Sequence, residues 1–243
     1  QSHAEGYFSE TVAESNASHA EGAYTQALGH NSHTEGWHTT TGEFAANAHA
    51  EGGYTQATGA RSHAEGSDTT ASGTDSHAEG FNSKASGNYS HAEGYKTKSS
   101  GKASHAEGIS TEAIGDYSHS EGESTKAKEI DTHAEGYGTT ASGAHSHAGG
   151  AYTVAGYANQ TAIGEYNDNK ATTLLEVGNG TADNARSNAF EVHSNGNIVA
   201  GGTVSDANGE LNAVAANSSD APTSLLNKLK IGSTTYDATA VKP

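Results

Sequence analysis

The first two thirds of this chain alternate small, polar and glycine residues in a pattern that returns every fourteen residues. Each repeat reads Ser-His-Ala-Glu-Gly, two variable residues, Thr-x-Ala-x-Gly, and a few residues that lead to the next Ser. The histidines of the repeat stand, with two spacings of sixteen, at positions 3, 19, 33, 49, 63, 77, 91, 105, 119, 133 and 147. A period this short predicts a solenoid, because one small rung buries a face only by stacking on its neighbours.

Within each repeat, the period-two alternation predicts two short strands, and the fixed glycines predict two turns with positive φ. A helix is disfavoured because each of the frequent glycines costs a helix about 1 kcal/mol relative to alanine. In the second strand we expect the variable residues to face water. The Thr and Ala beside them, such as Thr25 and Ala27, or Thr111 and Ala113, are expected to face inward.

The Ser-His-Ala-Glu strand places His and Glu on one face and Ala on the other. Because the second strand offers only small side chains, we expect His and Glu to point into the roll or across a seam between subunits. Ala would then allow another chain to approach closely. Ile163, which takes the Glu position one repeat after His147, fits an inward-facing side chain. The expected structural ladder includes His63, Glu65, His77, Glu79, His91, Glu93, His105 and Glu107.

The two repeats of sixteen residues each carry two extra residues. We expect these insertions in turns, around residues 9–11 in the first and within residues 39–47 in the second. A solenoid tolerates insertions at its corners, often on a binding face.

After residue 164 the chain changes to short apolar runs separated by Asn-Gly turns, which are the strongest local signal for hairpins. Runs at 172–177, 189–192 and 198–199 predict strands. A polar stretch follows at 204–222, then a short amphipathic helix or strand at 223–231, and a last hairpin at 231–236. We therefore divide the chain into a repeat shaft at 1–164, a β-hairpin module at 165–203, and a polar linker with a terminal segment at 204–243.

The composition argues against a conventional core and against several partners. Only 32% of the residues are hydrophobic, with four Phe and no Met, so regular stacking has to supply the stability. The net charge of −17 disfavours nucleic acid and anionic membranes, which need clustered Lys and Arg. No apolar run is long enough to span a bilayer, and the absence of Cys is compatible with an extracellular location. The start at Gln1, with the motif already in phase, suggests a segment of a longer protein.

The repeated His-x-Glu pairs leave three readings open. They could hold metal ions, since two donor side chains share a strand face and rungs stack about 4.8 Å apart. They could be hydrogen-bonded ladders that satisfy polar groups, with ion pairing raising the histidine pKa values. A catalytic role, with Glu as base and His as acid, is disfavoured by the number of copies along a rod. We expect the hydrogen-bonded ladder, no bound metal, no cofactor, no catalytic residue and no enzyme activity.

Aromatic residues recur one or two positions after the glycine of His-Ala-Glu-Gly, so stacking of the rungs would align them into a stripe. Such a stripe suits sugar rings and protein partners alike. It could instead seal a seam between subunits or cap a corner of the roll. The candidates for receptor binding are Tyr24, Trp37, Tyr54, Phe81, Tyr95 and Tyr137.

The rung resembles the head repeat of trimeric autotransporter adhesins of the YadA-like type, and residues 161–164, Thr-Ala-Ile-Gly, nearly restore the pattern of that family. The His/Glu version is similar to rungs of phage and prophage tail fibres and tail spikes. The resemblance covers about two thirds of the chain and implies a left-handed parallel β-roll with three chains side by side. Here His and Glu replace the family's Val and Ile, so its apolar energetics do not transfer. The module after residue 177 also resembles one common in phage tail proteins.

From these observations we expect an all-β protein, a parallel β-roll solenoid of 14-residue rungs that forms a homotrimer and is followed by a small β-rich module. The expected function is a rigid fibre or spike segment of a phage or prophage tail, located in the virion tail or outside the cell. It would contact neighbouring tail proteins and a host cell-surface glycan or protein, but not nucleic acid or the membrane interior. The alternatives are a bacterial surface adhesin head and the non-catalytic part of a polysaccharide-degrading tail spike. The sequence does not identify the host or the receptor.

Overall fold

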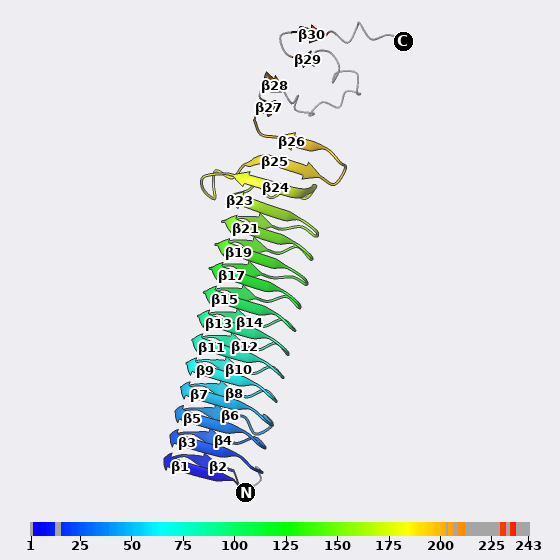
Figure 1. The fold of residues 1–243 in the computed structure, drawn as a ribbon. Helices are drawn as coiled ribbons and strands as arrows, with labels where there is room; N and C mark the ends of the chain where they lie inside the picture. The colour runs from blue at the N-terminus through cyan, green and yellow to red at the C-terminus, as the bar shows by residue number, and fades with distance from the viewer. Residues whose placement is uncertain are drawn as a thin grey trace.

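The chain forms an all-β rod in which short strands stack in one direction (Figure 1). The computed structural model describes residues 2–12 and 16–202, together with four short strands between residues 204 and 236. The repeats form a parallel solenoid of about twelve turns of roughly fourteen residues, which confirms the expected fold class. Across the described residues there is no helix of the length and apolarity needed to cross a membrane.

Each turn contributes a five-residue strand to one sheet and, in most turns, a two-residue strand to a second sheet. The five-residue strands are β1 (His3–Tyr7), β3 (His19–Ala23), β5 (His33–Trp37), β7 (His49–Gly53), β9 (His63–Ser67), β11 (His77–Phe81), β13 (His91–Tyr95), β15 (His105–Ile109), β17 (His119–Glu123), β19 (His133–Tyr137), β21 (His147–Ala151) and β23 (Thr161–Glu165). The two-residue strands are β2 (Glu10–Thr11), β4 (Gln26–Ala27), β6 (Thr40–Thr41), β8 (Gln56–Ala57), β10 (Thr70–Ala71), β12 (Lys84–Ala85), β14 (Lys98–Ser99), β16 (Glu112–Ala113), β18 (Lys126–Ala127), β20 (Thr140–Ala141) and β22 (Val154–Ala155).

Neighbouring turns keep one register, so that like residues lie over like residues. Between β11 and β13, His77 pairs with His91, Ala78 with Ala92 and Glu79 with Glu93. The first sheet has fifteen strands and the second has eleven. The register converts every position of the repeat into a ladder along the rod.

The interior of the roll is lined by alanine and threonine from both sheets. Thr25, Ala27, Thr111 and Ala113 are fully buried, which confirms the expected orientation of the second strand. The alanine of the His-Ala-Glu strand is also fully buried, as at Ala78. The two sheets therefore lie close enough that only small side chains fit between them.

This interior rules out one of the two expected orientations of the first strand, in which His and Glu point into the roll, and does not test a seam between subunits. The side chains of His63, Glu65, His77, Glu79, His91, Glu93, His105 and Glu107 are 30% to 36% exposed and face outward from the roll. Their alanine neighbours face the interior and offer no approach to another chain. Ile163 is 38% exposed, which contradicts the predicted inward side chain in the Glu position. Alternation separates the two faces of a strand but does not say which face is inside.

The two glycines of each repeat serve different purposes. Gly66 has a φ of +102°, and a Cβ there would lie 2.2 Å from the carbonyl oxygen of Gly80. Gly73 lies outside the positive-φ region, yet a Cβ on it would lie 1.9 Å from the oxygen of Gly87. Glycine is therefore required at the second position because successive turns approach closely there, and the positive φ predicted for this glycine is wrong. The left-handed corner positions are taken by other residues, such as Tyr24 with a φ of 59°.

Both insertions fall at the same corner of the roll. Strand β2 pairs in register with β4, so the first insertion follows Thr11 and does not include residues 9–11 as predicted. Strand β6 pairs in register with β4 and β8, so the second insertion follows Thr41, inside the predicted range. It carries Phe44, whose side chain is 91% exposed.

The solenoid ends in a strand that keeps the fourteen-residue spacing with a different sequence. Strand β24 (Thr173–Asn179) runs parallel to β23, with Leu175 opposite Thr161. This register places Glu176 in the alanine position, where it is fully buried. Its carboxylate accepts hydrogen bonds from Gln160 Nε2 at 3.1 Å and the Lys170 amide at 2.8 Å, and from the side chains of Asn167 and Thr173. A polar plug thus closes the alanine interior.

Beyond the plug, antiparallel strands β25 (Asn188–His193) and β26 (Ile198–Ala200) lie where the sequence predicted strands, but they join the first sheet of the solenoid. The predicted turn at residues 195–197 is present, with Gly196 at a φ of 85°. Strands β27 (Val204–Asp206) and β28 (Gly209–Leu211) form one antiparallel pair. Strands β29 (Leu229–Ile231) and β30 (Thr234–Tyr236) form the predicted last hairpin. The rest of the polar stretch and the predicted segment at 223–228 lie outside the described residues.

Candidate functional site

The outer face of the first sheet carries parallel rows of imidazole and carboxylate groups, here called the His/Glu ladder (His3 to His147 and Glu5 to Glu135 of the repeats). From His49 to His147 the rings stack with centroids 4.7 to 4.9 Å apart and interplanar angles of 1° to 10°. This spacing equals that of neighbouring strands. The ladder is therefore a direct product of the repeat register.

Most carboxylates lie near the imidazole of the next turn. His105 Nε2 is 3.2 Å from Glu93 Oε1, and the same distance recurs three times up to His147. Earlier in the rod the pairs are wider. The two oxygens of Glu65 lie 3.9 Å from His63 Nε2 and 3.9 Å from His77 Nε2, so that one carboxylate stands between two imidazoles. The predicted His/Glu hydrogen bonds are thus present in part of the ladder.

The protonation of the ladder differs from the expectation. Burial, together with the neighbouring imidazole of His63, lowers the pKa of His49. The same two causes, burial first, lower the pKa of His63 and His91, whereas ion pairing was expected to raise the histidine values. Hydrogen bonding with Glu35 and Glu65 raises the pKa of Glu51 to about 7. At His49, His63 and His91 the ladder therefore favours neutral imidazoles, and Glu51 shares a proton with its neighbouring carboxyl groups.

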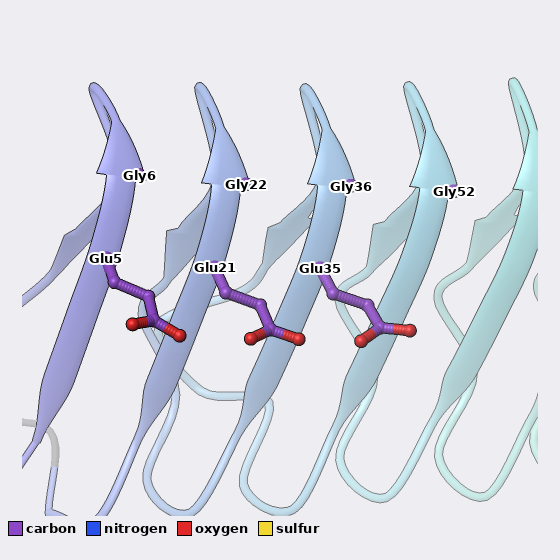
Figure 2. Close-up of a pocket in the computed structure, with 7 residues that line it drawn as sticks. All are labelled: Glu5, Gly6, Glu21, Gly22, Glu35, Gly36 and Gly52. Atoms are coloured by element: carbon purple, nitrogen blue, oxygen red, sulfur yellow. The ribbon is translucent and has the colours of Figure 1, made fainter.

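A long shallow hollow follows the glycines next to the carboxylates. It has a volume of about 560 Å³ and is lined by Glu5, Gly6, Glu21, Gly22, Glu35, Gly36 and Gly52. Figure 2 shows Glu5, Glu21 and Glu35 projecting the same way from successive strands, with the glycines beyond them. Because glycine adds no side chain, this face of the sheet can accept a close neighbour.

The aromatic candidates are all exposed, and the structure divides them into three clusters. In the first turns, Phe8, Tyr24, His38 and Tyr54 form a continuous stack with centroids 4.6 to 5.4 Å apart. Trp37 packs edge-on against Tyr54 at 4.6 Å. The other clusters are Phe81 with Tyr95, and Tyr137 with Tyr152 and Tyr166. Sequence reasoning missed His38 and Tyr166, although both share the offset of Tyr24 and Tyr54 after the glycine.

A groove runs beside the first aromatic cluster on the outer face of the second sheet. Two adjoining hollows of about 340 and 410 Å³ share His38 and Thr40. One wall is the stack of rings, and the other is the row of Gln26, Thr40 and Gln56. The groove and the His/Glu ladder belong to different sheets of the roll.

The serine before each histidine is not placed for nucleophilic chemistry. Ser76 is 2% exposed, and its hydroxyl donates to the carbonyl oxygen of Gly73 at 2.7 Å. Ser62 and Ser90 make the same bond within their own turns. The serine therefore closes the corner inside the roll, on the opposite side of the strand from the imidazole.

No protein-family model and no curated protein sequence matches this chain.

Proposed function

We propose that this chain is a rigid shaft segment of a phage or prophage tail fibre or spike, in which three copies lie side by side. The observation that carries the proposal is the unbroken register of the turns, which makes the repeat block a straight rod (Figure 1). About twelve turns at a strand spacing of ~4.8 Å span roughly 55 Å. A stack of identical turns is suited to holding two ends of an assembly at a fixed distance.

The seam between the copies is proposed at the His/Glu ladder. The interior of one roll contains alanine and small hydroxyl side chains, so a single chain buries little apolar surface. The ladder side chains remain about one third exposed, and the glycine hollow beside them leaves room for a neighbouring backbone. Association of identical copies around a symmetry axis would cover this face.

The second sheet and the aromatic corner would then face outward and could bind the host. Trp37 is 47% exposed, and Gly53, at the matching position of the next turn, has nothing within 4 Å of a built Cβ. Aromatic surface beside amide and hydroxyl groups suits recognition of sugar rings. This part of the rod is our candidate receptor surface.

The receptor role is tested by replacing Trp37, Tyr54 and Phe81 with Ala and measuring binding to bacterial cells and to a glycan array. We expect binding to be lost and the melting temperature to stay nearly unchanged. A large fall in melting temperature would assign the rings to packing.

The location is tested with gold-labelled antibodies against the chain, applied to phage particles induced from the bacterium that carries the gene. We expect label on the tail. Label on the bacterial surface without particles would favour the adhesin alternative.

A further inference from the structure

Part of the His/Glu ladder has donor atoms that the protein itself does not use. Several imidazole nitrogens among the described residues are individually buried and have no hydrogen-bond partner, although their side chains lie on the outer face of the sheet. They are the Nε2 atoms of His33, His49, His63, His77 and His91. A buried polar atom without a partner costs about 1–3 kcal/mol, so a ligand that binds these atoms would be stabilising.

The separations within the ladder fit a metal ion. Two ligands of a tetrahedral zinc ion, each about 2.0–2.2 Å from the metal, are roughly 3.4 Å apart. His91 Nε2 lies 3.5 Å from Glu79 Oε1, and His119 Nε2 lies 3.2 Å from Glu107 Oε1. In triads of two imidazoles and one carboxylate such as His105, Glu107 and His119, the donor atoms lie within 4.8 Å of one another. The second imidazole must swing toward the ion, because parallel rings point their nitrogens the same way.

The donor set of the ladder also suits a cation. Metal ligands are neutral imidazoles and ionised carboxylates, and a divalent ion would neutralise part of the row of carboxylates.

We propose that the His/Glu ladder is a linear array of sites for a divalent transition-metal ion of the zinc type. Each site consists of the imidazoles of two successive turns and the carboxylate between them. Imidazole with carboxylate, and no thiolate, suits zinc, nickel or copper, whereas calcium and magnesium prefer oxygen ligands alone. One chain supplies all three donors, and the open coordination position faces outward, toward water or another copy. The array ends at the turn of His147, where Gly149 replaces the glutamate.

The test titrates the full chain, after treatment with a chelator, with zinc chloride in a calorimeter and with calcium chloride as reference. Cobalt(II) absorption in the visible range reports coordination directly. The ladder variant combines Glu65→Gln, Glu79→Gln, Glu93→Gln and Glu107→Gln, which covers turns with unpartnered imidazole nitrogens and two of the triads. A control variant removes the same charge outside the ladder through Glu112→Gln, Asp116→Asn, Glu129→Gln and Asp131→Asn.

We expect several zinc ions to bind per unmodified chain at micromolar concentration, and calcium not to bind. The ladder variant should lose the sites of its segment, with affinity there falling roughly tenfold or more, since even outer-shell partners of a metal contribute that much. The control variant should bind as the unmodified chain does. Equal loss in both variants, or no zinc uptake by the unmodified chain, would overturn the proposal.

A second experiment uses only the unmodified chain, so its result does not depend on whether the variants fold. Zinc bound through imidazole should be released as the pH falls from 7.5 to about 5, because the ligands take up protons. Retention of zinc at the lower pH would overturn the proposal. The mass of the metal-free protein in solution separately tests the proposed trimeric shaft, so the two can fail independently.

Discussion

Replacing buried threonines by valine should stabilise this protein at some turns and destabilise it at another. Thr69 and Thr97 are almost completely buried, and their hydroxyl oxygens have no hydrogen-bond partner among the described residues. Thr125 occupies the equivalent position of a later turn, but its hydroxyl lies 2.8 Å from that of Ser120. The three side chains occupy the same position of the repeat, but the position of Ser120 holds Ala64 and Ala92 in the turns of Thr69 and Thr97, so only the Thr125 hydroxyl is satisfied.

The expected magnitudes follow from that difference. A buried polar atom without a partner costs about 1–3 kcal/mol, and valine has nearly the shape of threonine. Thr69→Val and Thr97→Val should therefore each raise the free energy of unfolding by about 1 kcal/mol. The two sites are two turns apart, so the double variant should gain about 2 kcal/mol. Thr125→Val leaves Ser120 without its partner and should lose about 1 kcal/mol.

The assay is urea unfolding followed by circular dichroism, with the midpoint compared at an unchanged slope. Thr125→Val is the matched control, since it makes the same chemical change at the same position of the repeat. A loss of stability in Thr69→Val equal to that in Thr125→Val would show that the Thr69 hydroxyl has a partner, and the reasoning would be refuted.

Four further predictions test other parts of the fold. Gly80→Ala, with a φ of +95° and a Cβ that would meet the Gly94 oxygen at 2.2 Å, should cost several kcal/mol in a urea melt, whereas Gly53→Ala should cost little because nothing lies within 4 Å. The pKa of His63 is lower in the folded protein than in the unfolded chain, where it is ~6.5. The contribution of His63 to stability is therefore full above pH ~6.5 and is lost as the pH falls below that value. Melting temperatures should drop between pH 7.5 and 5.5, and the drop should be smaller in His63→Gln. The pKa of Glu51 is raised to about 7 in the folded protein, so Glu51 acts in the opposite direction. The contribution of Glu51 to stability is full below the pKa of the unfolded chain and is lost as the pH rises through 7. In Glu51→Gln the melting temperature should therefore depend less on pH between pH 6 and 8. Glu176→Ala leaves the buried donors of the plug unpaired and should lower the free energy of unfolding by roughly 3 kcal/mol or more, and a loss under 1 kcal/mol would contradict the plug.

The repeat made much of the fold predictable, because period and glycine position dictate short strands that must stack. The inward placement of Thr111 and Ala113 followed from their small, invariable character beside variable neighbours. The orientation of the His-Ala-Glu strand did not follow, because alternation fits either face and the narrow space between the sheets decides for alanine. Glu176 also escaped notice, since Leu-Glu-Val-Gly hides the fourteen-residue spacing from Thr161 to Leu175.

The candidate sites were predictable as residue types but not as arrangements. The aromatic offset identified Tyr24, Trp37 and Tyr54, and their exposure agrees with a surface role. A stack of rings continues only through turns that carry a ring at the same offset after the glycine. In the turn between Tyr54 and Phe81 these positions hold Ser67 and Asp68, so the stack ends before Phe81. The protonation of the His/Glu ladder could not be read from composition, because it depends on how far each imidazole is buried.

The proposed association of three copies along the His/Glu ladder is tested by sedimentation equilibrium of the full chain at micromolar concentration, in the presence of a chelator. We predict a particle with the mass of three chains of 24.6 kDa each. A stable particle of one chain, with the β-sheet circular dichroism signal of the folded protein, would contradict it.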